Sequence, residues 1–346
     1  MRDIKTIPPT ISIINYLASR GYKIVLFTYH TEVKFEFSNI HLIQLKKKPY
    51  PIGLLKRIAA KIYFHLKFYR FLFKHKHAVN IIWLGAPDVI GIYGFKGAIK
   101  VVYQFHELEQ HRFNSCRKAD YLVVPEENRG WITYFLAKLK TKPLLLPNIP
   151  NYGGFNISED KEITALKNMG KITVLYSGLI DNKKRSLKEL VKAFDFLPAK
   201  YVLVIIPSFV KVRNDLEDLK KYVKSLNLSG RVVFLNSRMP PNHLNTIAAA
   251  DIGIGFYSAT SLNNVYAAPN RLYEFVNFGT LLILPDFPAF KALSGVFPYA
   301  VNVTDISNPR EISVIIEDIM LNINKQKNHY LHLKRLKGTM NILQEM

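Results

Sequence analysis

The chain has 346 residues, which exceeds the usual size of a single domain and favours two domains. Its 49% hydrophobic and 21% charged residues exclude an intrinsically disordered protein. Lys and Arg number 48 against 26 Asp and Glu, so the net charge of +22 favours a polyanionic partner: nucleic acid, an anionic membrane or a phosphorylated substrate.

The single cysteine, Cys116, excludes an internal disulfide and is typical of a reducing compartment. The sequence has no apolar run of about 18 residues, the length that a membrane-spanning helix needs. Residues 1–5 lack the apolar core of a signal peptide. We therefore expect a cytoplasmic protein.

The first half, residues 1–150, alternates helices with short apolar strands. A helix that starts at Pro8 and stops at Gly21 precedes a buried strand, Lys23–Thr28. Further strands are expected at His41–Leu45, Val79–Leu84, Lys100–Gln104, Tyr121–Val124 and Lys142–Leu146. The pattern predicts an α/β domain with a mostly parallel sheet. Since such a domain normally begins with a strand, we expect that its first strand is missing.

A long basic helix is predicted at Leu54–Phe73, in a stretch from residue 37 to 87 with ten Lys or Arg and no acidic residue. At about 100° per residue, one arc of this helix is apolar and the opposite arc is cationic. Three interpretations are open: a solvated face, an interfacial helix on anionic lipid, or a contact to nucleic acid phosphates. In the lipid interpretation the Phe rings among the cations insert into the membrane, and the contacts are Lys56, Arg57, Phe64, Lys67, Phe68 and Phe71.

Polar residues follow two strands of this half. His106 and Glu107 come just after Lys100–Gln104, where residues of a parallel sheet face the binding crevice. They are candidate hydrogen-bonding or acid–base groups, although a capped turn also explains them. Glu126 and Glu127 follow the next strand at a helix start, where a structural role is favoured.

Residues 151–170 are the predicted linker, and a second α/β domain is expected at residues 171–322. Its strands are predicted at Ile172–Ser177, Tyr201–Ile206, Arg231–Leu235, Ile252–Phe256, Leu281–Leu284 and Ala300–Val303. Its helices are predicted at Leu187–Phe196, Arg213–Leu226, Pro241–Ala250, Asn270–Phe278 and Arg310–Met320. A ligand is expected in a cleft between the two domains. The basic residues 323–346 form either a final helix or a loose tail.

A candidate diphosphate site follows the first strand of this second domain. The strand leads into Gly178, which lets the backbone approach a ligand closely, and a loop with Lys184 and Arg185 follows. Ser186 and Glu189 have the spacing of a capping box, which predicts a helix start at Ser186. A solvated basic loop is the alternative.

A second candidate site is the helix between Pro269 and Gly279, which suit a helix start and stop. Asn270, Arg271 and Glu274 lie three and four residues apart and are expected to share its exposed face. The helix start and Arg271 favour an anion, and Glu274 can accept hydrogen bonds from ribose hydroxyls. Together the two sites predict a nucleotide.

Pro207 and Arg238 follow later strands at the same edge and are candidate contacts to a nucleobase. The sequence has no Walker-type loop, no Gly-x-Gly-x-x-Gly after a strand, no metal-spaced Cys and His set, and no D-x-D motif. None of these motifs for a metal or a separate cofactor is therefore available to the ligand.

These motifs resemble the retaining, nucleotide-sugar-dependent glycosyltransferases of the GT-B fold, of the group 1 (family 4) type. The resemblance covers both halves and is strongest between Lys171 and Pro285. It is carried by Tyr176–Gly178 with the loop to Arg185, by Ala250–Ile254, and by Pro269–Phe275 with Gly279. Weaker matches are Phe105–Glu107, Ala119–Tyr121 and Pro147–Asn148.

The resemblance implies two facing Rossmann-like domains, with the donor bound mainly by the second and the acceptor mainly by the first. It implies that Glu274 holds the donor ribose, that Arg185 holds the diphosphate, and that Asn270 and Arg271 line the donor pocket. It places His106 near the transferred sugar and implies transfer without a required metal.

Two departures from the family pattern concern the donor. Tyr266 stands where the family has the first acidic residue of its E-x7-E pattern, and Leu179 stands where many members have an arginine. Lys184 and Arg185 are then left to balance the diphosphate.

We therefore expect a retaining glycosyltransferase that acts on a glycan or lipid-linked acceptor at the inner face of the membrane, in cell-surface polysaccharide synthesis. A catalytically impaired relative that binds a nucleotide sugar or a partner enzyme is the alternative. A nucleic-acid binder is disfavoured, because no recognised nucleic-acid module is present.

Overall fold

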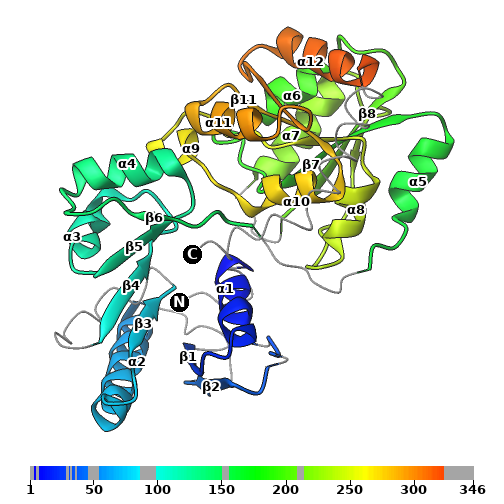
Figure 1. The fold of residues 1–346 in the computed structure, drawn as a ribbon. Coiled ribbons are helices and arrows are strands. Elements are labelled where there is room, and N and C mark those ends of the chain that lie inside the picture. The colour runs from blue at the N-terminus through cyan, green and yellow to red at the C-terminus, as the bar shows by residue number, and fades with distance from the viewer. Residues whose placement is uncertain are drawn as a thin grey trace. The chain divides into compact units, whose positions relative to one another are not determined.

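The structure, a computed structural model, describes residues 4, 8–28, 31, 33–35, 37–45, 54–85, 99–149, 156–208 and 214–322. The chain divides into two compact units, Met1–Asn151 and Tyr152–Met346 (Figure 1). Each unit alternates helices with parallel strands, as the sequence pattern predicts. The basic segment 323–346 lies outside the described residues.

The first unit contains two parallel sheets among its described residues. One pairs β1 (Ile24–Thr28) with β2 (Ile40–Gln44), and the other has the order β3 (Ile81–Leu84), β4 (Lys100–Gln104), β5 (Tyr121–Val124), β6 (Leu144–Leu145). The helices are α1 (Pro8–Ser19), α2 (Leu54–His75), η3 (Gln110–Arg112), α3 (Phe113–Cys116) and α4 (Glu127–Leu136). Gly21, just past α1, has the left-handed φ of 85° that its role as a helix stop predicts. That the first domain lacks an initial strand stays a prediction.

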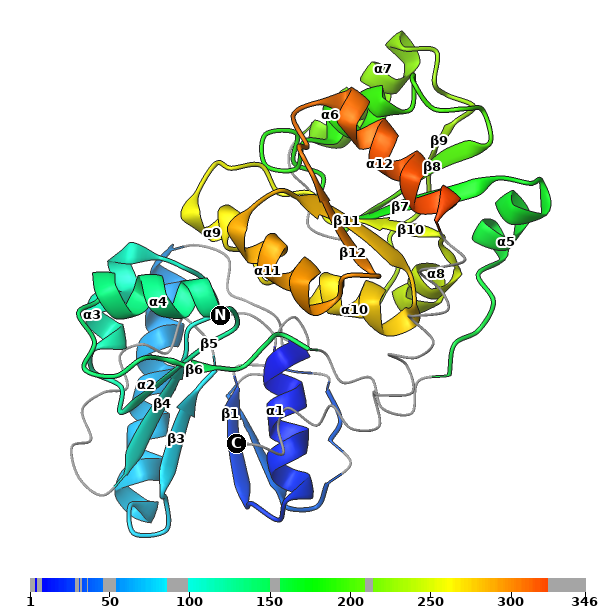
Figure 2. The ribbon, with the colours of Figure 1, turned by 45° about the horizontal axis from the view of Figure 1, so that its top comes forward.

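The second unit is built on a six-stranded parallel sheet. Its order is β12 (Val301–Thr304), β11 (Leu281–Pro285), β10 (Ile252–Ile254), β7 (Ile172–Gly178), β8 (Tyr201–Pro207), β9 (Val232–Phe234). The helices are α5 (Lys161–Asn168), α6 (Leu187–Ala193), α7 (Asp215–Ser225), α8 (His243–Ala249), α9 (Leu262–Val265), α10 (Asn270–Phe278), α11 (Pro288–Val296) and α12 (Pro309–Leu321). Figure 2 shows α6, α7 and α12 on one side of the sheet and α8 and α10 on the other.

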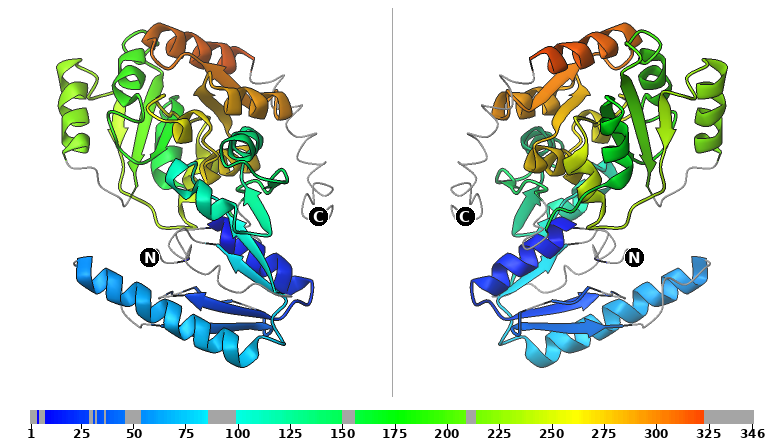
Figure 3. Two further views of the ribbon diagram at one scale, coloured as in Figure 1. Left: turned by 90° about the vertical axis from the view of Figure 1, so that its left-hand side faces the viewer. Right: turned by 90° about the vertical axis from the view of Figure 1, so that its right-hand side faces the viewer.

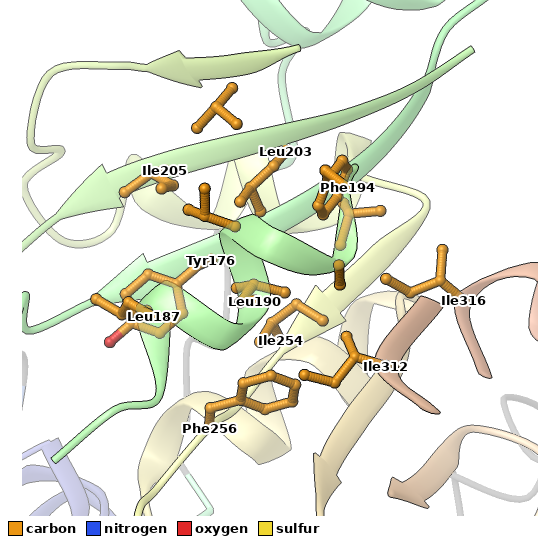
Figure 4. Close-up of a cluster of buried hydrophobic side chains, with 14 of the residues drawn as sticks. Tyr176, Leu187, Leu190, Phe194, Leu203, Ile205, Ile254, Phe256, Ile312 and Ile316 are labelled. Carbon is orange, nitrogen blue, oxygen red and sulfur yellow. The ribbon is translucent and has the colours of Figure 1, made fainter. Parts of the chain in front are cut away.

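Helices cover both faces of this sheet because its strands are apolar on both faces. In β7, Tyr176 belongs to a buried cluster with α6, α7 and α12, whereas Leu175 belongs to a second cluster with α5, α8, α10 and α11. Figure 4 shows Leu190 of α6 and Ile254 of β10 in the first cluster. Because all neighbouring strands of this sheet are parallel, their carboxyl ends share one edge, where loops can hold a ligand.

The segment expected to be a linker contains a helix, α5. Asp160 caps this helix, and its carboxylate accepts hydrogen bonds from the backbone N–H groups of Glu162 and Ile163 at 3.2 Å. Ile163 is fully buried in the second cluster. The linker prediction is wrong for this part, because the buried Ile163 packs the helix on the core of the second unit.

The orientation of α2 differs from the prediction. The rings of Phe68 and Phe71 lie 5.2 and 5.0 Å from the ring of Phe27 in β1, and Phe64 is buried. Figure 3 shows α2 running alongside β1 and β2. The prediction that Phe64, Phe68 and Phe71 insert into a membrane is wrong, because these rings form the face of the helix that packs on the sheet.

The predicted cationic membrane contacts of α2 have mixed outcomes. Lys67 is exposed, whereas the side chains of Lys56 and Arg57 lie outside the described residues. None of the helices in the described ranges is both long enough and apolar enough to traverse a bilayer.

Candidate functional site

The loop after β7 starts from a fixed frame at the carboxyl edge of the second sheet. Gly178, the last residue of β7, lies beside Pro207 of β8, and the N–H of Ser208 donates to the Gly178 carbonyl at 2.7 Å. The Tyr176 hydroxyl donates to the Leu179 carbonyl at 2.6 Å. Burial raises the pKa of Tyr176, so this hydroxyl remains a donor. Both ends of the turn at Gly178 are thus held by hydrogen bonds.

Three consecutive cations, Lys183, Lys184 and Arg185, follow in this loop. Lys183 and Lys184 have exposed side chains, and the Asp181 carboxylate accepts hydrogen bonds from their backbone N–H groups at 3.1 Å. The guanidinium carbon of Arg185 lies 4.0 Å from the centroid of the Tyr257 ring. Since Asp181 is buried and the two lysines are exposed, the side chains that this loop presents to solvent are cationic.

Helix α6 starts after Ser186, as predicted, but not through a capping box. Ser186 has a left-handed φ of 46°, and its side chain makes no cap hydrogen bond. Its Oγ instead lies 3.0 Å from the Oγ of Ser258, whose N–H donates to the Lys184 carbonyl at 2.9 Å. The capping-box prediction is wrong because this tertiary contact takes the hydroxyl and joins the loop after β7 to the loop after β10.

Helix α10 begins at Asn270 after Pro269 and ends before Gly279, whose φ is 82°, as predicted. Arg271 joins this helix to β7, since its Nη1 donates to the Ser177 carbonyl at 2.7 Å and also contacts the Ser177 hydroxyl. The half-buried Asn270 opens the helix.

The two predicted sites lie at one place, the carboxyl end of β7. The positive charges of Arg185 and Arg271 both act on the buried hydroxyl of Tyr176, where each favours the deprotonated form. The loop therefore contributes one cation and α10 contributes another. A dianionic group is the natural ligand for such a pair.

Glu274 is buried, with 3% exposure, and not on the exposed face as predicted. Its Oε2 lies 3.1 Å from Arg271 Nε and 3.2 Å from Nε2 of His243 on α8. Since a carboxylate oxygen only accepts, His243 carries a proton on Nε2 when Glu274 is ionised. The prediction of exposure is wrong because α8 covers this side of α10.

The depth of α10 depends on two glycines of the β10 segment. A Cβ on Gly253 would lie 2.5 Å from the Phe275 ring, and a Cβ on Gly255 would lie 2.8 Å from Leu272. Both contacts are shorter than carbon atoms tolerate, so α10 lies closer to the sheet than any residue larger than glycine would allow.

The two residues predicted to contact a nucleobase differ in surroundings. Pro207 ends β8, and its carbonyl accepts a hydrogen bond from the Ser237 hydroxyl at 2.7 Å. The guanidinium of Arg238 forms ion pairs with Asp160, at 3.1 Å, and with Glu162 of α5. Arg238 therefore contacts the start of α5 through these two ion pairs. Its contact to a nucleobase stays a prediction.

In the first unit, His106 and Glu107 lie just past β4, as predicted. His106 Nε2 is 3.0 Å from the Gly85 carbonyl beyond β3, so this nitrogen is the protonated one. The His106 carbonyl accepts a hydrogen bond from Arg129 Nη1 at 2.5 Å. Arg129 is buried at the start of α4, and Glu126 caps this helix, as its predicted structural role requires.

Four site residues were not predicted from the sequence. Ser177, His243 and Ser258 support the second-unit site, and Arg129 supports His106. The sequence shows His243 only as a single histidine in a short helix, and its partner Glu274 is 31 residues away. Among the described residues, no group of three or more His, Cys, Asp or Glu side chains could hold a metal ion.

No family model and no curated protein matches the sequence. Solved structures match it in fold. HepE of Anabaena, in complex with UDP, is 12% identical over 95% of this chain and 90% of its own, with a TM-score of 0.67. Sucrose-phosphate synthase of Thermosynechococcus elongatus is 16% identical over 94% and 88%, with a TM-score of 0.67. WaaG, a glycosyltransferase involved in lipopolysaccharide biosynthesis, is 13% identical over 96% and 91%, with a TM-score of 0.62. The chain thus has the GT-B fold of two Rossmann-like domains.

Proposed function

We propose that this GT-B chain is a retaining glycosyltransferase that moves a hexose-type sugar from a nucleoside diphosphate to a glycan or lipid-linked acceptor. One observation carries the proposal: a buried carboxylate, Glu274, lies one helical turn from Arg271, at the strand end where Arg185 also acts. Such a set suits a ribose beside a diphosphate. The similarity in fold to HepE, which has been solved with UDP and with UDP-glucose, supports this assignment.

Each donor-site residue has a proposed role. Lys184, Arg185 and Arg271 bind the diphosphate, which approaches the backbone at Gly178. Asn270 lines the pocket at the start of α10, and Glu274 accepts hydrogen bonds from the ribose hydroxyls. During transfer the bond between the sugar and the diphosphate breaks, the oxygen of the acceptor hydroxyl forms the new bond on the same face, and its proton passes to the leaving diphosphate. The cations stabilise the charge that develops on the leaving diphosphate, so we propose that no metal is needed.

On the acceptor side we propose that His106 and Glu107 contact the transferred sugar or the acceptor. The proton on His106 Nε2 is donated to the Gly85 carbonyl, which fixes the orientation of the ring. The acceptor is proposed to be a growing cell-surface polysaccharide at the cytoplasmic face of the membrane. The role of WaaG in lipopolysaccharide biosynthesis supports that setting.

A second candidate is a catalytically impaired relative that binds a nucleotide sugar. It is favoured by Tyr266, which follows α9 at the position where the family has an acidic contact to the sugar. A phenol cannot replace a carboxylate as an acceptor for several sugar hydroxyls.

The test is a thermal-shift screen of UDP-, GDP- and ADP-sugars, followed by assays of hydrolysis and transfer. We expect one nucleotide series to stabilise the protein and its sugar to be released or transferred. Stabilisation without turnover would favour the impaired relative. No stabilisation by any nucleotide sugar would refute both.

A further inference from the structure

Helix α2 has a second apolar face, and this face is exposed. It lies on the opposite side of the helix from the buried Phe64 and Phe68. Five large side chains form it, with exposed fractions between 47% and 81%, and we call them the outer stripe: Leu55, Ile58, Ile62, Leu66 and Phe73. At about 100° and 1.5 Å per residue, they fall within about 60° of one direction and extend over about 27 Å.

The outer stripe is hollowed at its centre. A shallow depression of about 380 Å³ lies between the side chains of successive turns, lined by Ile58, Lys61, Ile62, His65, Leu66 and Tyr69. Most of this lining is apolar. A continuous exposed apolar row of this length is unusual on a soluble domain and indicates a binding surface.

Cations flank the outer stripe on both sides. Lys61 lies on one side, Lys67, Arg70 and Lys74 lie on the other, and all four are exposed. No acidic residue occurs between residues 37 and 87. Long cationic side chains can extend away from an apolar surface while their stems stay on it. The helix thus has an apolar centre and cationic borders.

This charge pattern discriminates between possible occupants. A nucleic acid needs cations along the contact, but the centre of this surface is apolar. A second copy of the chain would bring two rows of cations together without an acidic partner from either helix. An anionic bilayer satisfies both features, since its acyl region takes the apolar residues and its headgroups take the cations.

We infer that the outer stripe is the surface through which the protein docks on a membrane that contains anionic lipid, with α2 lying in the plane of the interface. The inference rests on the proposed function in one respect, a lipid-linked acceptor, and the residues it assigns are distinct from the donor site. The inserted side chains are Ile62 and Leu66 with their stripe neighbours, not the Phe rings of the inner face.

The experiment is co-sedimentation of the full chain with phosphatidylcholine vesicles, with and without phosphatidylglycerol. The test variant combines Ile62→Ser with Leu66→Ser. The matched control combines Val314→Ser with Leu321→Ser on α12, whose exposed fractions are 54% and 81%. We expect the wild type and the control to bind anionic vesicles and the α2 variant to bind about tenfold more weakly or worse. Binding of the wild type to neutral vesicles should be weak.

Two further measurements separate the possible failures. Circular dichroism shows whether each variant is folded, and a UDP-induced thermal shift without vesicles reports the donor site alone. Equal vesicle binding by the α2 variant and the wild type would overturn the inference, as would no binding by the wild type. A wild-type dimer that the α2 variant loses, without vesicle binding, would assign the outer stripe to a second copy instead.

Discussion

Replacement of Glu274 by Gln tests the donor site most directly. Glutamine has nearly the same volume and still offers an oxygen to Arg271 Nε and His243 Nε2, which now lie 3.1 and 3.2 Å from the carboxylate. The change therefore removes the charge and turns the other carboxylate oxygen, an acceptor, into an NH2 group, a donor. We expect the variant to fold, with unfolding free energy lower by about 1 kcal/mol because Arg271 loses its counter-charge.

The expected loss of affinity follows from the ribose contacts. A hydrogen bond to a charged group is worth about 1.5–3 kcal/mol and one to a neutral group about 0.5–1.5 kcal/mol, so each hydroxyl loses about 1–1.5 kcal/mol. Two ribose hydroxyls then lose about 2–3 kcal/mol, which corresponds to roughly 30- to 150-fold weaker binding.

Isothermal titration calorimetry with UDP, or with the nucleoside diphosphate that gives the largest thermal shift, measures the effect. Glu317→Gln on α12, which changes a half-buried carboxylate far from Arg271 in sequence, is the control and should bind as the wild type does. Ligands that lack the 2′- or 3′-hydroxyl complete a double-mutant cycle. The wild type should lose affinity for these ligands, and the Glu274 variant should discriminate little. A variant that binds the intact nucleotide as tightly as the wild type would refute the ribose role.

Three further predictions concern nucleotide binding by Arg271, the packing of Ile163 and the burial of Cys116. Arg271→Lys should weaken nucleotide binding about tenfold by calorimetry, because lysine cannot contact both Ser177 and Glu274 as the guanidinium does; unchanged affinity would argue against this bridge. Ile163→Ala should lower the unfolding free energy by about 2–5 kcal/mol in urea, whereas exposed Ile157→Ala should have little effect; equal effects would contradict the docking of α5. Burial raises the pKa of Cys116 from 9.0 to about 12, so the contribution of the protonated thiol to stability is complete below pH 9 and is lost progressively between pH 9 and about 12. Between pH 8 and 10 the wild type should lose about 1.4 kcal/mol more than Cys116→Ala, and equal losses would contradict the shift.

The elements that local chemistry specifies were predicted closely. Pro269 and Gly279 predict the limits of α10, and both limits are confirmed. The strands Lys100–Gln104 and Tyr121–Val124 have the predicted bounds. In each case the signal lies within a few residues of the element, because caps, turns and apolar runs act locally.

The features that the sequence pattern missed depend on residues far along the chain. Ser186 has the local spacing of a cap, but Ser258, 72 residues away, takes its hydroxyl. Helical periodicity places apolar residues on both sides of α2, and only the contact with Phe27 decides which side is inner. The burial of Glu274 likewise depends on His243, which a pattern on α10 alone does not reveal.

The two glycines beneath α10 determine how closely this helix, and with it the candidate site, can approach the sheet. Because Arg271 and Glu274 are carried on the helix that rests there, their height above the sheet is set by atoms that β10 lacks. A single methyl group at residue 253 would raise the helix without altering any group that we propose to touch the donor. Substitutions at residues 253 and 255 can therefore change the position of α10 while Arg271 and Glu274 themselves stay unchanged.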